Sequence, residues 1–501
     1  MVYQLWIMFA LYVLGLGFIV LFYPKIPLSL CIMSALFWGA LIYIFSAVFL
    51  AFFGLYTRFI WVLMSAEIII FIMININRRP IWKTISWKNT IIWGIILLCL
   101  FSSVLVVTNN RHFFIFNTDS KHYVAQASHI FNSGSIITPG AGRFFRTNYG
   151  VSEALMHSLA RFVPQPILTI WHPYLWITLY SSFFVLLYKF SQQKKMSKSA
   201  SVILGLLMTL WAGTAGMNWV NGYFIHIHLF SAASIFFAIY FFGKMVASEQ
   251  EETEYGFLGA LALCGFGLSR AESSIWIGLI LALLLGAKKF TRKEMFVVFF
   301  PPILIEIIWL TFSLFAYLGY ENRFWTDSRI ILMLGAYILF ALFTIIIVFN
   351  KKLQNYAENY LTNIVFIIIL TLSLLLFIIN PNNQITNLIA IFKQLFHGEN
   401  WGYYWWENLV IFTLIVFCKK FLQKKDSFSQ ATKIVGMMVL AYLLIILDVG
   451  FFRSSYGATR WWDSGGRMLS HISPIIGFYI CKSMYDYFPL ASLFTKEELH
   501  K

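Results

Sequence analysis

The feature that most constrains this chain is a repeated run of apolar residues. Runs of roughly 18–25 residues recur along the sequence, as in IIWGIILLCLFSSVLVV (91–107) and NIVFIIILTLSLLLFII (363–379), and each can cross a bilayer core of about 30 Å as a helix. Lipid gives backbone polar groups no partners, so spanning segments are helices or closed barrels. Because the runs are continuous and do not alternate, we predict an all-α, polytopic transmembrane bundle.

The composition excludes several other classes of protein. Charged residues make up only 12% of the chain, about half the share in soluble domains. The net charge of +16 is expected to reflect basic cytoplasmic loops, so no nucleic-acid partner is predicted. No basic segment or cleavage site precedes the first apolar run, which we therefore expect to be a retained helix. The five cysteines are widely separated and show no metal or disulfide spacing.

We predict 13–15 spans and mark fifteen candidates. They are 5–23, 27–53, 59–76, 90–108, 171–189, 199–217, 222–243, 256–269, 273–287, 295–319, 330–349, 361–380, 408–423, 434–452 and 468–487. The short pair at 256–287 is also compatible with a partly re-entrant hairpin. No soluble domain is expected, because the longest segment between spans is the loop 109–170.

The loops alternate in character along the chain. One set is rich in lysine and is predicted to be cytoplasmic, because basic residues collect on that side; it comprises the loops around 78–88, 189–198, 287–294, 350–356 and 419–433, the tail, and the acidic segment 244–255. The other set is richer in arginine, histidine and aromatic residues and is predicted to face outward together with the N-terminus; it comprises 109–170, 218–228, 269–273, 320–329, 381–407 and 453–471.

The large outer loop is predicted to carry two amphipathic helices, at 120–132 and 152–163, separated by an irregular segment rich in Gly and Pro. Both are expected to lie in the membrane interface with their apolar sides down. Asp119, just before the first helix, is either an N-cap residue or a general base, and one carboxylate can do both. Lys121 and His122 follow it as interfacial polar residues or as ligand contacts.

Two further segments place charge where apolar residues dominate. Arg270 and Glu272 lie between two apolar runs with almost no loop around them, so they either pair with each other or line a cavity that binds an anion. The last outer loop combines arginines, which suit phosphate oxygens, with aromatic residues; the alternative is an aromatic belt with snorkelling arginines. Its members are Arg453, Tyr456, Arg460, Trp461, Trp462, Asp463, Arg467 and His471.

Other polar segments carry a weaker signal. Residues 397–408 are best interpreted as an aromatic belt. His226 and His228 stand two residues apart and do not share a helical face, so a common metal site is not favoured, although the pair could line a cavity. No nucleotide-binding or P-loop motif is present.

Three stretches together resemble the GT-C type of integral-membrane glycosyltransferase. They are FNTDSKHYVAQASHIFNSGSI (116–136), GLSRAES (267–273) and GGRMLSHISPIIGFY (465–479), within a resemblance that extends over residues 90–487. The resemblance implies a donor sugar on a polyprenyl phosphate, catalysis at the outer face of the membrane and inversion of the sugar's configuration. It divides the chain into N-terminal transmembrane helices (1–89) and a catalytic region (90–501) that contains the loop 109–170.

Carried over to this sequence, the resemblance implies that Asp119 deprotonates the acceptor, and that Arg270 and Arg467 hold the donor phosphate. We add Arg460 and Lys121 to the phosphate contacts. Candidate acceptor or sugar contacts are His122, Arg143, Arg146, Glu153, Glu272, Trp461, Trp462, Asp463 and His471. The chain departs from the family in having three spans before the catalytic loop, and in Ser120 following Asp119 where a second acid would support a metal. No metal site or cofactor is therefore predicted, with a divalent cation left open.

The sequence thus predicts a membrane glycosyltransferase, in a bacterial cytoplasmic membrane, with its active site facing outward. Its partners would be the bilayer, a polyprenyl-phosphate-linked sugar, and a glycan, lipid or protein acceptor. The alternatives are a polysaccharide polymerase or O-antigen-ligase-like enzyme, a lipid-linked-sugar flippase or transporter, and a purely structural role. Transporters commonly contain inverted repeats, and no repeat is visible in this sequence.

Overall fold

The protein is an all-helical bundle, as the sequence predicts. The computed structural model describes residues 2–78, 86–109, 118–136, 150–163, 165, 167–214, 228–248, 251–270, 273–316, 327–396, 436–442, 444–445, 447–448 and 470–487. Every regular element in these ranges is a helix. Among them, eight helices are long and apolar enough to cross a membrane, which fits a multi-pass membrane protein. The expected span 408–423 lies outside the described residues.

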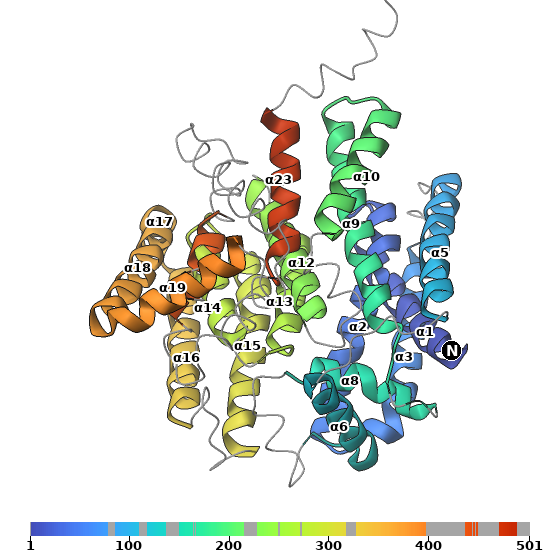
Figure 1. Cartoon of the computed structure of the whole chain (residues 1–501), viewed down its shortest axis with the longest axis horizontal. Helices are drawn as coiled ribbons and strands as arrows, with labels where there is room; N and C mark the ends of the chain where they lie inside the picture. The colour runs from blue at the N-terminus through green and yellow to red at the C-terminus, as the bar shows by residue number, and fades with distance from the viewer. Residues whose placement is uncertain are drawn as a thin grey trace, which may run out of the picture.

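Figure 1 shows how the described helices are arranged. In chain order they are α1 (Val2–Ile19), η1 (Val20–Phe22), α2 (Leu28–Phe52), α3 (Tyr56–Asn77), α5 (Trp87–Asn109), α6 (Thr118–Ser133), α8 (Ser152–Ser158), η2 (Leu159–Phe162), α9 (Trp171–Gln193), α10 (Lys198–Thr214), α12 (His228–Ala247), α13 (Thr253–Gly267), α14 (Ser273–Leu285), α15 (Arg292–Ala316), α16 (Asp327–Phe349), α17 (Lys351–Tyr356), η3 (Ala357–Leu361), α18 (Thr362–Ile379), α19 (Pro381–Phe396) and α23 (Ser473–Tyr487).

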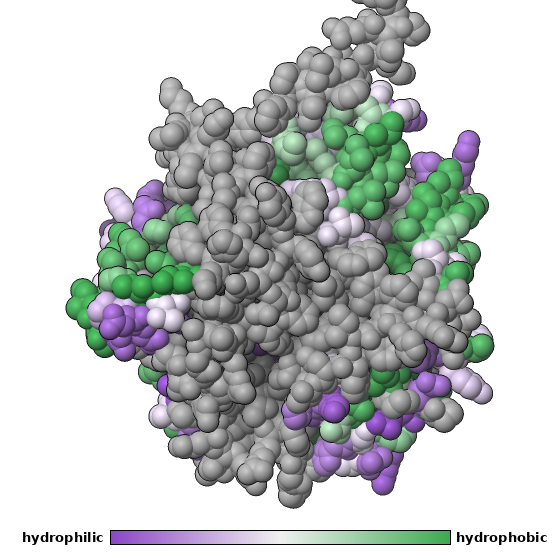
Figure 2. Space-filling view, in the orientation of Figure 1, coloured by the Kyte–Doolittle hydropathy of each residue, from purple (hydrophilic) through white to green (hydrophobic). Residues whose placement is uncertain are grey.

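Large apolar side chains cover much of the outer surface. Figure 2 shows green, apolar areas over α5 and α10 on one side of the molecule and over α18 on the other. Leu98 of α5 is 66% exposed and Leu332 of α16 is 72% exposed. Such continuous apolar surface is unfavourable in water but is satisfied by lipid. We therefore take these faces to be the lipid-facing sides of the bundle.

One end of the bundle gathers lysine-rich loops, as the alternation of loops predicts. Lys25, before α2, forms ion pairs of 2.9 and 2.7 Å with Glu252 and Glu254, before and in α13. Lys288, after α14, lies 2.9 Å from Glu294 at the start of α15. We call this the lysine end, defined by residues 23–27, 189–198, 248–254, 286–294 and 349–358.

The opposite end gathers the loops that are predicted to share the other side. Gln4 donates to the carbonyl oxygen of Ile167 (3.2 Å), which places the N-terminus beside the segment before α9. Val151 N donates to the carbonyl oxygen of Leu268 (3.0 Å), which joins the segment before α8 to the end of α13. This grouping of loops is confirmed for these segments. That the second end faces outward stays a prediction.

Helix α2 occupies the centre and contacts α1, α3, α5, α8, α9 and α13. Its contact with α1 depends on glycine. A Cβ added at Gly39 would lie 1.7 Å from the carbonyl oxygen of Leu11, and one at Gly15 would lie 1.8 Å from that of Ala35. Small residues let helix backbones approach closely, which is how helices associate where water provides no hydrophobic drive.

We expect Gly39→Ala to destabilise the protein by about 1–3 kcal/mol or more, because α1 and α2 must separate to admit the methyl group. The measurement is the thermal unfolding midpoint of the purified protein in detergent. Gly94→Ala is the matched control, because a Cβ there has nothing within 4 Å. Equal midpoints for the two variants would show that the α1–α2 approach does not contribute to stability.

Candidate functional site

The structure describes five of the side chains that the sequence predicts as site residues: Lys121, His122, Glu153, Arg270 and His471. The others lie outside the described side chains: Asp119, Arg143, Arg146, Glu272, Arg460, Trp461, Trp462, Asp463 and Arg467. For Asp119 only the backbone, in the first turn of α6, is described. Lys121 is exposed and His122 is half-buried, whereas the remaining three are buried.

Arg270 lies in the turn between two unusually short helices. α13 has 15 residues and α14 has 13, so they rise only about 22 Å and 20 Å. Both are shorter than the apolar core of a bilayer, which is about 30 Å thick. Arg270 is only 6% exposed. A guanidinium buried within a bundle of apolar helices is costly and commonly marks a ligand site or an ion pathway.

Arg270 belongs to a buried network with two histidines and a tyrosine. Its Nη1 lies 3.2 Å from His228 Nδ1, and His228 Nδ1 lies 2.7 Å from His471 Nε2. The hydroxyl of Tyr442 lies 3.1 Å from His471 Nδ1. One proton assignment satisfies these contacts: Arg270 and His471 Nε2–H donate to His228 Nδ1, and Tyr442 donates to His471 Nδ1. In this assignment both imidazoles are neutral.

The network is held by packing from three directions. The ring of Tyr442 stacks on Trp276 of α14 with centroids 3.8 Å apart. The ring of Phe266, near the end of α13, meets His471 edge-on. The hydroxyls of Ser231 and Ser269 lie 2.8 Å apart and tie the first turn of α12 to the Arg270 turn. Arg270 and His471, which are 201 positions apart in the sequence, are thus brought together.

The segment before α8 lies directly on the Arg270 turn. Gly150 N donates to the carbonyl oxygen of Ser269 (2.9 Å), and Ser152 Oγ donates to that of Leu268 (2.8 Å). A Cβ at Gly150 would lie 2.2 Å from the carbonyl carbon of Ser269, so only glycine permits this approach. The next residue after Ser152 is Glu153, which brings a second group of ionisable residues to the same end.

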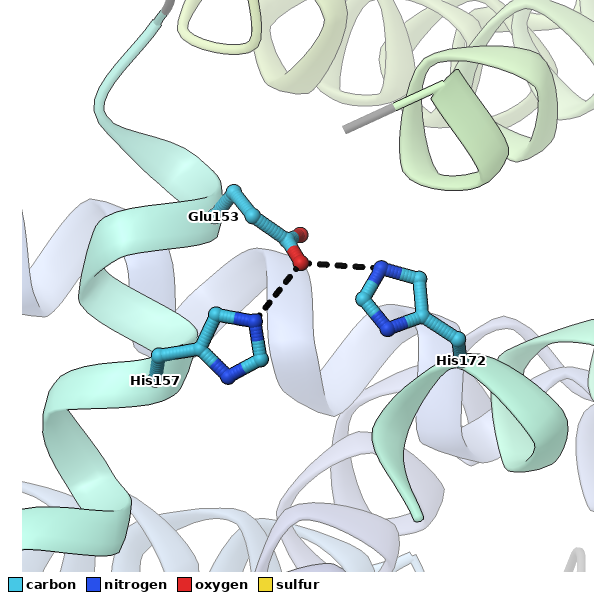
Figure 3. Close-up of side chains that lie close together, drawn as sticks. All are labelled: Glu153, His157 and His172. Atoms are coloured by element: carbon cyan, nitrogen blue, oxygen red, sulfur yellow. Dashed lines mark ion pairs between the residues drawn. The ribbon is translucent and has the colours of Figure 1, made fainter. Parts of the chain in front are cut away.

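Glu153 of α8 sits between two histidines (Figure 3). Its Oε1 lies 3.0 Å from Nε2 of His157, one turn further along α8, and 2.8 Å from Nε2 of His172 in the first turn of α9. Glu153 and His157 are fully buried, and His172 is 2% exposed. Neither carboxylate oxygen makes a well-aligned hydrogen bond with a described residue, and Oε2 makes no ion pair there either. Oε2 is an acceptor that burial leaves unsatisfied there.

The hydrogen bonds fix the tautomer of His157. Its Nδ1 accepts from the backbone N–H of Leu168 (3.1 Å), so the ring hydrogen is on Nε2, facing Glu153. The ligand atoms of Glu153, His157 and His172 are close enough together to hold a metal ion. A metal on Nε2 would require the ring hydrogen on Nδ1, where Leu168 already donates. The donor set therefore favours a proton-holding cluster over a metal site.

The charge of Glu153 is set by two opposing effects. Complete burial raises the pKa of its carboxyl group, but the charge and N–H of His172 together with the N–H of His157 outweigh burial and hold the pKa below its ordinary value of 4.5. Glu153 is therefore a carboxylate at neutral pH. It is a buried base whose hydrogen-bond donors come from two different helices.

The position of α8 differs from expectation. The second amphipathic helix of the large loop was expected in the membrane interface, but every residue of α8 is buried, and the helix packs between α2 and α6. The apolar residues Leu155 and Leu159 do share a buried face, yet the polar residues opposite them are buried too. Glu153 and His157 contact a histidine and a backbone group in place of water.

Three buried side chains of this end were missed by the sequence reasoning. His172 and Tyr442 stand at the start of or within apolar runs, where a single polar residue is unremarkable. Glu306 is a fully buried acid within α15, hydrogen-bonded to Ser274 just beyond the Arg270 turn. A charge in the middle of a predicted span was the available signal for Glu306.

We expect Glu153→Gln to lower stability by about 3–5 kcal/mol, because the amide lacks the negative charge that interacts with His172 and places an NH2 group in a buried position. The measurement is the unfolding free energy or midpoint in detergent. Glu358→Gln is the control, since Glu358 makes a long, largely exposed pair of 3.6 Å with Lys289, which is worth at most about 1 kcal/mol. Equal losses would show that the Glu153 contacts carry no special weight.

The same cluster predicts a pH dependence. Because the folded-state pKa of Glu153 is below its ordinary 4.5, its stabilisation is fully present above that pH and is lost as the pH falls toward the folded value. The gap in unfolding midpoint between wild type and Glu153→Gln should therefore be present at pH 5 and narrow below about pH 4.5. A gap that widens in acid would contradict the assigned charge.

Comparison with known proteins found no matching family model and no matching curated protein.

The candidate site consists of two buried groups of side chains at one end of the bundle. They are the network of Arg270, His228, His471 and Tyr442, and the cluster of Glu153, His157 and His172.

Proposed function

We propose that this protein is a membrane glycosyltransferase that moves a sugar from a polyprenyl-phosphate donor to a lipid, glycan or protein acceptor, with inversion. The active site would face the outside of a bacterial cytoplasmic membrane. The observation that supports the proposal most is the location of Arg270. It is buried in the turn between the short helices α13 and α14. Contacts join it through His228 to His471.

A buried guanidinium suits a phosphate that is attached to a lipid. The donor's phosphate group would lie near the boundary of the apolar core while its polyprenyl chain stays in lipid. A guanidinium carries a fixed charge, and its forked N–H groups match the geometry of phosphate oxygens. The imidazoles of His228 and His471 add polar groups beside the guanidinium. No nucleotide is needed, because the phosphate is itself the leaving group.

The reaction asks for two kinds of group. Positive charge must stabilise the phosphate oxygen as the bond to the sugar breaks, and a base must take the proton of the attacking hydroxyl. Arg270 is the candidate for the first role. For the second, Asp119 is the prediction from the sequence, and Glu153 is the candidate from the described side chains. Glu153 is ionised, and its Oε2 has no hydrogen-bond partner among the described residues.

Both candidate bases belong to helices that pack together. α6 contacts α8, and Arg161, just after α8, donates to Ser128 of α6. Residues 150–152 are hydrogen-bonded to the backbone just before Arg270, and Glu153 is the next residue in the chain. Comparing Asp119→Asn with Glu153→Gln would identify the base.

We expect Arg270→Ala to reduce sugar transfer by about 10²–10³-fold, the usual cost of removing one electrostatic stabiliser of a transition state. The assay uses the full chain in liposomes with a panel of synthetic polyprenyl-phosphate sugars, and measures release of polyprenyl phosphate by mass spectrometry. Arg292→Ala is the matched control, because Arg292 lies at the lysine end over the ring of Phe349.

Other results would exclude the proposal. Wild-type activity in Arg270→Ala would remove the phosphate role. Activity restricted to diphosphate-linked oligosaccharides would indicate a polymerase or ligase. Movement of the intact donor across the bilayer, without transfer of its sugar, would indicate a flippase.

A further inference from the structure

A cavity lined by lysines lies at the lysine end, away from the Arg270 network and the Glu153 cluster. Its volume is about 340 Å³, and its walls come from α2, α9, α12, α13 and α23 and from the turn before α2. Helices α9, α12 and α23 lie side by side here (Figure 1). Four lysines line the cavity: Lys25, Lys189, Lys244 and Lys482. No carboxylate is among its described lining residues.

The four lysines differ in how far their charges are compensated. Lys25 is paired with Glu252 and Glu254, so it contributes little net charge. Lys482 Nζ lies 4.5 Å from the centre of the Phe190 ring, a cation–π contact. Lys189 and Lys244 are exposed and make no ion pair or hydrogen bond with another described residue. These two lysines give the cavity its net positive charge.

The same arrangement of residues recurs on three helices. On α9, Lys189 lies one turn nearer the lysine end than Leu186, which also lines the cavity. On α12, Lys244 is likewise one turn beyond Tyr240. On α23, Lys482 is one turn beyond Phe478 (both line the cavity as well). Residues three or four apart share a helical face, so each helix presents an ammonium group toward the end and an apolar group toward the bundle.

We propose that this cavity binds the phosphate headgroup of an anionic phospholipid from the leaflet on the lysine side. The ammonium groups of Lys189, Lys244 and Lys482 face the phosphate, and the apolar residues one turn deeper face the start of the acyl chains. Basic pockets between transmembrane helices are suited to such headgroups, and 340 Å³ is at the small end of ligand pockets, as a headgroup requires.

The test is native mass spectrometry of the full chain in detergent, titrated with phosphatidylglycerol and, separately, with phosphatidylcholine. We expect retention of one phosphatidylglycerol at concentrations where phosphatidylcholine is not retained. Replacing both uncompensated lysines (Lys189→Gln with Lys244→Gln) should weaken phosphatidylglycerol binding about ten- to thirtyfold. Each single variant should give part of that loss, which keeps the test valid if the double variant fails to fold.

The matched control is Lys198→Gln with Lys351→Gln, which removes the same charge from exposed positions at the same end, outside the cavity. An equal loss in this control would overturn the proposal in favour of diffuse surface charge. Equal retention of phosphatidylcholine would overturn it too. Competition by millimolar inorganic phosphate that matches the lipid's effect would instead identify a soluble phosphate compound as the ligand and exclude the headgroup.

Discussion

A permanent positive charge buried at Arg270 is the constraint around which this end of the bundle is arranged. Burying a guanidinium is costly unless other groups compensate its charge, and the polar groups that solvate it must come from the protein itself. His228 and His471 provide such groups from α12 and from the segment before α23. Gly150 contacts the backbone of Ser269 closely, and this contact brings α8, with the carboxylate of Glu153, to the same end of the bundle as Arg270.

The sequence was sufficient to predict the architecture because hydrophobic burial and helix length leave few alternatives in lipid. α2 (Leu28–Phe52) and α16 (Asp327–Phe349) begin and end within a few residues of the predicted spans. The alternation of loops also predicted which loops lie together: Lys289 pairs with Glu358, and the backbone N–H of Glu252 donates to Glu294. Both inferences rest on local composition, which tertiary packing seldom overrides here.

The candidate site was only partly predictable, because its members meet through long-range packing. Arg270 stood out as a charge between two apolar runs, but nothing near it in the sequence indicated His228 or Tyr442 as neighbours. Glu153 and His157 share a helical face at a spacing of four, a pattern that is equally common on solvated surfaces. These two residues form a buried cluster because α8 lies inside the bundle and because His172 of α9 contacts Glu153.

Two helices, α12 and α23, extend from the Arg270 network toward the lysine end of the bundle. α12 starts at His228, in contact with Arg270, and carries Lys244 near its other end. α23 begins two residues after His471 and carries Lys482. The same two helices therefore support both the buried Arg270 network and the lysine-lined cavity at the opposite end of the bundle.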